Sequence, residues 1–245
     1  ANPGSPLEIM TSNWTYDIEV FNDTAYLGGE FGLTTIDVAD PSNPGSPEYR
    51  ETGRYGKRIA LAGSHAYITD TDEGLQSIDI SNPIHPQSPN YTGICGVARG
   101  LAAIDNYVLV AAHNEGLMVF DTSTAGAPEY VCSVGTLSQA YGVTVVGSTA
   151  YIADLSYGLA IFDITNPESP QPPVYCDTAG LARHVTIAGD FAYVADQDKG
   201  LAIIDISDPE NLEPPIYRDT AGSAGYVAVY DAMAYVADDY TGIAV

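Results

Sequence analysis

The sequence predicts an all-β protein, a six-bladed β-propeller built from four-stranded blades that repeat every 42 residues. Three observations lead to this prediction, and the first is the composition. The 245 residues include 24 Gly, 16 Pro and 18 Tyr, and no long stretch has helical periodicity, which favours many short strands and turns. The second observation is an internal repeat, and the third is the division of each copy into four short segments. Apolar residues make up 45% of the chain, which is enough for a packed core.

Single residue types recur at a constant spacing of 42 residues. The repeated glycines are Gly32, Gly74, Gly116, Gly158, Gly200 and Gly242, and the repeated aspartates are Asp37, Asp79, Asp121, Asp163 and Asp205. A tyrosine keeps the same spacing at Tyr67, Tyr151, Tyr193 and Tyr235, with Leu109 in the remaining place. Tyr26 is one residue out of step, which a single deletion near residues 28–31 explains.

One copy of the repeat illustrates the four predicted strands. They cover residues 184–189, 191–196, 201–206 and 216–219, with a Pro-rich connection before the last one because Pro cannot occupy a central strand. Gly200 follows the turn between the second and third strands and can adopt the positive φ of a tight hairpin. These two strands are apolar at nearly every position, which indicates that both faces of the sheet are covered.

The two ends of the sequence complement each other. Residues 2–6 have the same sequence as residues 43–47, the approach to an outer strand, whereas the last copy stops inside its third strand. We therefore expect Leu7–Met10 to supply the outer strand of the last blade, so that residues 1–10 complete it and close the ring. Residues 1–245 would then form a single propeller domain.

Four segments carry a resemblance to a known family. GLAIIDISDP (200–209), GLAIFDITNP (158–167), GLQSIDISNP (74–83) and AYVAD (192–196) resemble the LVIVD repeat. The resemblance implies a β-propeller of the kind found in bacterial and archaeal proteins that are often secreted or attached to the cell surface. It differs from the kelch and WD40 types, because Trp14 is the only Trp and no repeated Trp-Asp pattern occurs.

The charge balance excludes some partners. Lys and Arg number 8 against 32 Asp and Glu, a formal net charge of −24, so the chain as a whole would repel nucleic acids and anionic membranes. No apolar run approaches the ~20 residues that span a bilayer, so we expect no direct membrane insertion. Partners would instead be other surface proteins or an anionic or carbohydrate ligand.

Candidate binding residues come directly before each innermost strand, on the face of a propeller that surrounds the central channel. They are Tyr16, Lys57, Arg58, Arg99, Tyr141, Arg183, His184 and Tyr226. Arg presents a planar fork to carboxylate, sulfate or phosphate, and Tyr offers a flat apolar face with a polar tip. A basic and tyrosine-rich mouth in an acidic protein therefore predicts an anionic or sugar-like ligand. The alternative is that these cations only pair with nearby carboxylates such as Asp17, Asp70, Asp154 and Asp196.

Acidic and thiol groups receive structural interpretations. The aspartate that recurs in the third strand stands among apolar residues, so we expect it to be buried and to accept hydrogen bonds from backbone N–H or hydroxyl groups. The Asp-rich turns 70–74, 196–200 and 238–239 resemble fragments of calcium loops, but each offers too few oxygens, and we predict neither a metal nor another cofactor. Cys95, Cys132 and Cys176 have no metal-binding spacing, and three buried thiols are preferred to one disulfide.

No catalytic motif occurs in the sequence. The leading hypothesis is therefore a non-catalytic extracellular or cell-surface propeller that acts as a binding or structural module. The alternative is a lyase or hydrolase acting on acidic polysaccharide. A lyase would need a base and a charge neutraliser at one point, and the set available is Arg183 and His184 with Tyr141 or Tyr226.

Overall fold

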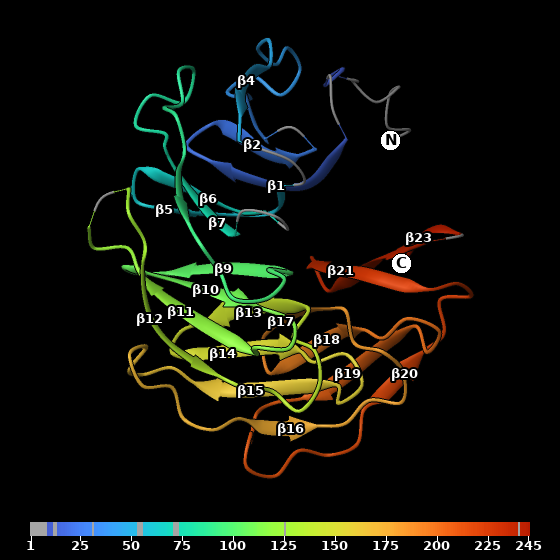
Figure 1. The fold of residues 1–245 in the computed structure, drawn as a ribbon. Coiled ribbons are helices and arrows are strands. Elements are labelled where there is room, and N and C mark those ends of the chain that lie inside the picture. Colours follow the sequence, from blue (N-terminus) through green and yellow to red (C-terminus); the bar gives the residue numbers. More distant parts are fainter. Residues whose placement is uncertain are drawn as a thin grey trace. The chain divides into compact units, whose positions relative to one another are not determined.

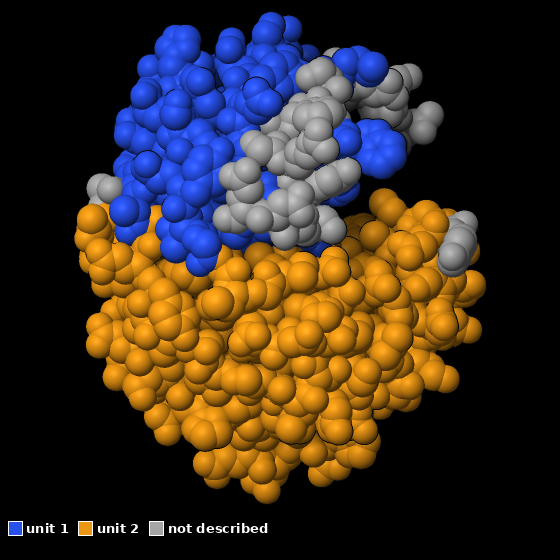
Figure 2. All heavy atoms as spheres, in the orientation of Figure 1, with its two compact units in different colours: residues 1–93, 125–127 blue, residues 94–124, 128–245 orange. Residues whose placement is uncertain are grey.

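The computed structural model describes residues 9–11, 14–30, 32–52, 56–70, 74–124, 126–239 and 241–245. Its regular elements are β-strands (Figure 1), and none of the described segments forms a helix long and apolar enough to cross a membrane. The chain divides into two compact units, residues 1–93 with 125–127 and residues 94–124 with 128–245 (Figure 2), which are treated separately here.

The first unit contains two four-stranded sheets. The first sheet consists of β1 (Thr15–Phe21), β2 (Thr24–Gly29), β3 (Gly32–Asp37) and β4 (Glu48–Glu51). The second consists of β5 (Gly56–Ala62), β6 (His65–Asp70), β7 (Gly74–Asp79) and β8 (Asn90–Thr92).

The second unit contains four sheets. The third sheet consists of β9 (Gly100–Ile104), β10 (Tyr107–Ala111), β11 (Leu117–Asp121) and β12 (Glu129–Val134). The fourth consists of β13 (Gly142–Val146), β14 (Thr149–Ala153), β15 (Leu159–Asp163) and β16 (Val174–Cys176). The fifth consists of β17 (His184–Ala188), β18 (Phe191–Ala195), β19 (Leu201–Asp205) and β20 (Ile216–Arg218), and the sixth of β21 (Ala224–Tyr230), β22 (Met233–Asp238) and β23 (Gly242–Ala244).

Each sheet is an antiparallel meander whose strands are hydrogen-bonded in chain order, which is the construction of a propeller blade. The predicted all-β, six-bladed β-propeller class is thereby confirmed. The four strands predicted for residues 184–219 agree with β17 to β20, and each observed strand ends one residue earlier. The predicted deletion is also found, because Gly29 pairs directly with Gly32 where Asp70 pairs with Gly74 in the second sheet.

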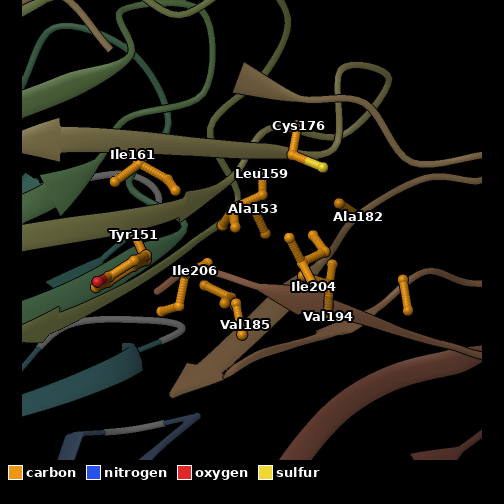
Figure 3. Close-up of a cluster of buried hydrophobic side chains, with 12 residues drawn as sticks. Tyr151, Ala153, Leu159, Ile161, Cys176, Ala182, Val185, Val194, Ile204 and Ile206 are labelled. Atoms are coloured by element: carbon orange, nitrogen blue, oxygen red, sulfur yellow. The ribbon is translucent and has the colours of Figure 1, made fainter. Parts of the chain in front are cut away.

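The core lies between successive sheets. In the second unit, Tyr151 and Leu159 of the fourth sheet pack with Val185, Val194 and Ile204 of the fifth, and none of these side chains is more than 7% exposed (Figure 3). This arrangement explains why the middle strands are apolar at consecutive positions, since both faces of each sheet are covered. The tyrosines that recur in the second strand belong to this core, since Tyr26, Tyr67 and Tyr151 are buried.

The recurring aspartates differ from expectation in burial but not in bonding. They end the third strand of each sheet and are exposed or half-buried, so the expected burial was wrong. Asp163 Oδ1, for example, accepts hydrogen bonds from Thr165 N at 2.8 Å and Thr165 Oγ1 at 2.6 Å. The equivalent bonds of Asp37, Asp79, Asp121 and Asp205 start the Pro-rich connection in the same way. These hydrogen bonds lower the pKa of Asp79, Asp121, Asp163 and Asp205 below the usual value.

All three cysteines are free, in agreement with the preference against a disulfide. Their burial differs, because Cys176 is buried, Cys132 is half-buried and Cys95 is exposed. The expectation of three buried thiols was therefore wrong for Cys95 and, in degree, for Cys132.

The N-terminal segment was predicted to complete the last blade. Residues 1–8 lie outside the described residues, and the described strands of the sixth sheet are β21 to β23. Ile9 packs against a cluster of Ala25, Leu27 and Ile36 in the first sheet. Ring closure and the single-domain organisation stay predictions.

Candidate ligand-binding site

The site in the second unit is built where the first strands of successive sheets begin. β9 contacts β13, and β13 contacts β17. Two glycines allow this close approach: a Cβ on Gly100 would lie 2.8 Å from Tyr141 O, and one on Gly142 would lie 2.9 Å from Arg183 O. The residues just before these strands, Arg99, Tyr141 and Arg183, are thus brought together at one end of the sheets.

Tyr141 is the centre of the cluster. The Arg99 guanidinium carbon lies 5.0 Å from the centroid of the Tyr141 ring, and that of Arg183 lies 5.7 Å from it, both within the range of a cation–π contact. The His113 ring approaches the same tyrosine at 6.0 Å with an interplanar angle of 51°. We call Arg99, Tyr141 and Arg183 the Arg–Tyr–Arg cluster.

Neither guanidinium of the cluster forms an ion pair with a carboxylate among the described residues. Arg183 instead contacts a neutral amide, since the Gln197 oxygen, when turned toward it, accepts bonds from Nε at 2.6 Å and Nη2 at 2.5 Å. Arg99 Nε is buried and has no hydrogen-bond partner in the described part of the chain. The alternative that these cations only pair with carboxylates therefore does not describe Arg99 and Arg183.

His184 and Tyr226 form a separate aromatic pair. Their rings are stacked with centroids 3.6 Å apart and an interplanar angle of 25°, and His184 Nδ1 accepts a hydrogen bond from Val227 N at 3.4 Å. Arg183 is adjacent to His184 in the chain but contacts Tyr141 and Gln197 instead. The set proposed for a lyase is thus divided between two groups of contacts.

The remaining predicted residues belong to the first unit. Arg58 Nη1 donates a hydrogen bond to Tyr16 O at 3.4 Å, and Asp17 Oδ2 accepts one from Ile59 N at 3.1 Å. Burial raises the pKa of Asp17, and the positive charge of Arg58 partly opposes this. Carboxylate pairing therefore describes Arg58 better than it describes Arg99 or Arg183. The Lys57 backbone lies in β5, and its side chain falls outside the described residues.

Buried aspartates secure the connections that lead to the cluster. Asp196 is fully buried and accepts hydrogen bonds from Thr178 Oγ1 at 2.8 Å and Gly180 N at 2.9 Å. Tyr217 Oη accepts a third bond from the same connection, from Ala179 N at 2.7 Å. Burial raises the pKa of Asp196 to about 6, against the lowering effect of these hydrogen bonds. The segment before Arg183 is therefore held at three successive residues.

Metal binding was not predicted, and calcium loops were the less favoured interpretation of the Asp-rich turns. Among the residues that the structure describes, no three His, Cys, Asp or Glu side chains are grouped as metal ligands. Residues 71–73 of the first such turn lie outside the described part. In the second turn, the oxygens of Asp196 are used by Thr178 and Gly180.

Sequence reasoning missed two contributors to this site. Gln197 and His113 lie in the turns between the second and third strands, and each is paired by an isolated bridge with the following connection, at Ala224 and Ala140. Both have positive φ, 46° and 52°. The repeat offered a signal, because residues 113, 155 and 197 are equivalent positions 42 residues apart.

Solved structures of low sequence identity share the fold. The computationally designed Ika8 protein has a TM-score of 0.73 at 10% identity over 94% of this chain and 69% of that chain. A chain of the Mitotic Checkpoint Complex has 0.74 at 10% identity over 96% and 75%, and U3-55K has 0.58 at 8% over 94% and 89%. These similarities concern the fold alone. No curated protein matches the chain.

The family comparison agrees with the repeat found in the sequence. The model of the LVIVD repeat matches residues 14–49, 53–90, 95–136, 138–178 and 179–213. The five matches correspond to the first five sheets and cover most of the chain. The sixth copy of the repeat is represented by β21 to β23. The chain therefore belongs to the LVIVD repeat family.

Proposed function

We propose that this propeller is a non-catalytic interaction module, located outside the cell or on its surface, that binds an anionic carbohydrate through the Arg–Tyr–Arg cluster. The LVIVD propeller fold supports an interaction module, while ligand and location are the proposed parts. The ligand class follows from the chemistry of the cluster. Arg binds carboxylate or sulfate with two parallel hydrogen bonds, and a tyrosine ring packs against the apolar face of a sugar.

One observation carries the proposal: two guanidinium groups share one tyrosine ring, and neither is neutralised by a carboxylate of the described residues. The protein has a formal net charge of −24, so carboxylates are abundant on its surface. Two unneutralised arginines in such a chain favour an anion supplied from outside. The buried Nε of Arg99 supports this, since a ligand oxygen would satisfy it.

The test is a glycan array followed by titration calorimetry with a selected oligouronate. We expect binding to acidic glycans, and a loss of about tenfold or more in affinity for each of Arg99→Ala and Arg183→Ala, because each removes a charged hydrogen bond worth about 1.5–3 kcal/mol. Arg218→Ala is the matched control. It also removes one cation, but Arg218 Nη1 contacts only the neighbouring Tyr217 carbonyl among the described residues.

Turnover assays on uronate polymers belong to the same experiment. We expect no product. Release of unsaturated or hydrolysed oligosaccharide would support the enzyme alternative. Absence of binding across the array, or binding that survives both substitutions, would refute the proposal.

A further inference from the structure

We infer that Gln197 is the positioning residue that sets the charge selectivity of the Arg–Tyr–Arg cluster: its neutral amide holds the Arg183 guanidinium in place without cancelling its positive charge. The inference rests on the proposed function and names the group that keeps one of its two cations available. It concerns a residue in a turn of the fifth sheet that neither the repeat pattern nor the family assigns to a site.

The contact between the two side chains defines the orientation of Arg183. Only one placement of the Gln197 amide suits its surroundings, with the oxygen toward the guanidinium, where it accepts from Nε at 2.6 Å and from Nη2 at 2.5 Å. Nη1 is not used in this contact, and it is the part of the fork left for a ligand. The Arg183 guanidinium remains 5.7 Å from the centroid of Tyr141.

The backbone of Gln197 is fixed from two sides, which makes its side chain a defined support. Its N–H donates to Ala224 O at 3.1 Å, and its carbonyl accepts from Ala224 N at 3.1 Å and Gly200 N at 2.9 Å. It also lies in the left-handed region at a φ of 46°, where residues other than Gly are uncommon. Strained conformations of this kind occur preferentially at binding sites.

The equivalent turns do not provide the same support. The corresponding residues are His113 in the third sheet and Leu155 in the fourth, each with positive φ and an isolated bridge to the next connection. Leu155 has no polar atom in its side chain, and His113 contacts the Tyr141 ring. Gln197 is therefore the position of the three where an amide oxygen meets an arginine.

The choice of Gln over Glu is the physical core of the inference. Glu is nearly isosteric and offers two acceptor oxygens, so it would keep both hydrogen bonds and add an ion pair. It would also place a negative charge beside the guanidinium that the ligand must use. A purely structural role is consequently preserved by Glu, whereas a role in anion selectivity is abolished by it.

The experiment compares Gln197→Glu, Gln197→Ala and Gln171→Glu in the full chain, with an oligouronate titrated by calorimetry at low and high salt. Gln171 is exposed in the connection before β16, and its substitution makes the same change in net charge away from the cluster. We expect Gln197→Glu to melt at or above the temperature of the wild type, yet to lose as much affinity as Arg183→Ala. Gln197→Ala should lose less, and Gln171→Glu should bind like the wild type.

A second readout does not depend on a ligand. In nitrogen-15 NMR spectra, the Arg183 Nε–H signal, assigned by its loss in Arg183→Ala, should exchange slowly with water in the wild type and in Gln197→Glu, and quickly in Gln197→Ala. Unchanged affinity in Gln197→Glu would overturn the inference while the proposed function stands. A slow signal that persists in Gln197→Ala would also overturn it. If the wild type binds no acidic glycan, the proposed function fails and the inference fails with it, whatever the NMR shows.

Discussion

At the scale of single residues, Asp196 shows how a buried group links the fold to pH. Its carboxylate is fully buried, and burial raises its pKa from 3.8 to about 6 while Thr178, Gly180 and Lys199 oppose the rise. A folded-state pKa above that of the unfolded chain means that the native protein binds the proton more tightly. The contribution of Asp196 to stability therefore falls as the pH rises from about 4 to about 7.

We predict that the wild type melts at a higher temperature at pH 5 than at pH 7, and that this difference is smaller in Asp196→Asn. The amide oxygen can still accept from Thr178 or Gly180 but does not titrate. The measurement is the melting temperature against pH at constant ionic strength. Asp163→Asn is the control, because hydrogen bonds from Thr165 lower the pKa of Asp163 and its titration falls below this window. An identical pH dependence in Asp196→Asn and the wild type would contradict the assignment.

The repeat identified the residues before each first strand, and three of them, Arg99, Tyr141 and Arg183, do come together in the second unit. It could not identify Gln197, because the contact depends on a positive φ and on a side chain that reaches back along its own sheet. Nor could it separate Arg183 from His184, because that depends on which neighbour each side chain contacts.

At the scale of elements, the glycines of the first strands control how closely successive sheets approach. Gly142 in β13 faces β17, where a Cβ would lie 2.9 Å from Arg183 O and 3.1 Å from His184 Cα. Both neighbours are backbone atoms, so neither can move without shifting the strand. This glycine therefore connects sheet packing with the geometry of the Arg–Tyr–Arg cluster.

Gly142→Ala should destabilise the protein by about 1–3 kcal/mol through overpacking, which corresponds to a fall of several degrees in melting temperature. It should also weaken oligouronate binding, because β13 and β17 would separate. Thermal denaturation and calorimetry measure the two effects. Gly135→Ala is the matched control, since a Cβ there meets nothing within 4 Å. Equal melting temperatures of the two variants would show that the close approach is not required.

Element boundaries were predictable because they recur. The strands of residues 184–219 were each correct to within one residue, and the shortened turn of the first sheet followed from a tyrosine out of step. The burial of the recurring aspartates was not predictable from neighbouring residue types. Asp163 ends β15, and an Asp at a strand end can accept bonds from the turn that follows while remaining in water.

At the scale of the whole molecule, the sequence assigns residues 1–10 to the last blade. The described part of this segment includes Ile9, which packs against Ala25, Leu27 and Ile36. Cys176 at the end of β16 provides a comparison, since it packs into a cluster with Val194 and Ile204 of the following sheet. Ile9 thus behaves like the end of an outer strand that precedes the first sheet.

Deletion of residues 1–10 should lower the melting temperature by about 5 °C or more and increase aggregation, because it removes an apolar contact worth about 1.5–3 kcal/mol and leaves a strand edge unpaired. Differential scanning calorimetry and light scattering provide the readouts. Deletion of residues 1–6 is the control, because it retains Leu7–Met10. The strand assignment would be wrong if both truncations behaved like the full chain.

The central claim is that an anion from outside completes the charge of Arg99 and Arg183. A crystal structure of the protein with an acidic oligouronate tests it most directly. The account predicts carboxylate oxygens at about 3 Å from both guanidinium groups, with a sugar ring against Tyr141. An oligouronate bound elsewhere, with Arg99 and Arg183 untouched, would contradict it.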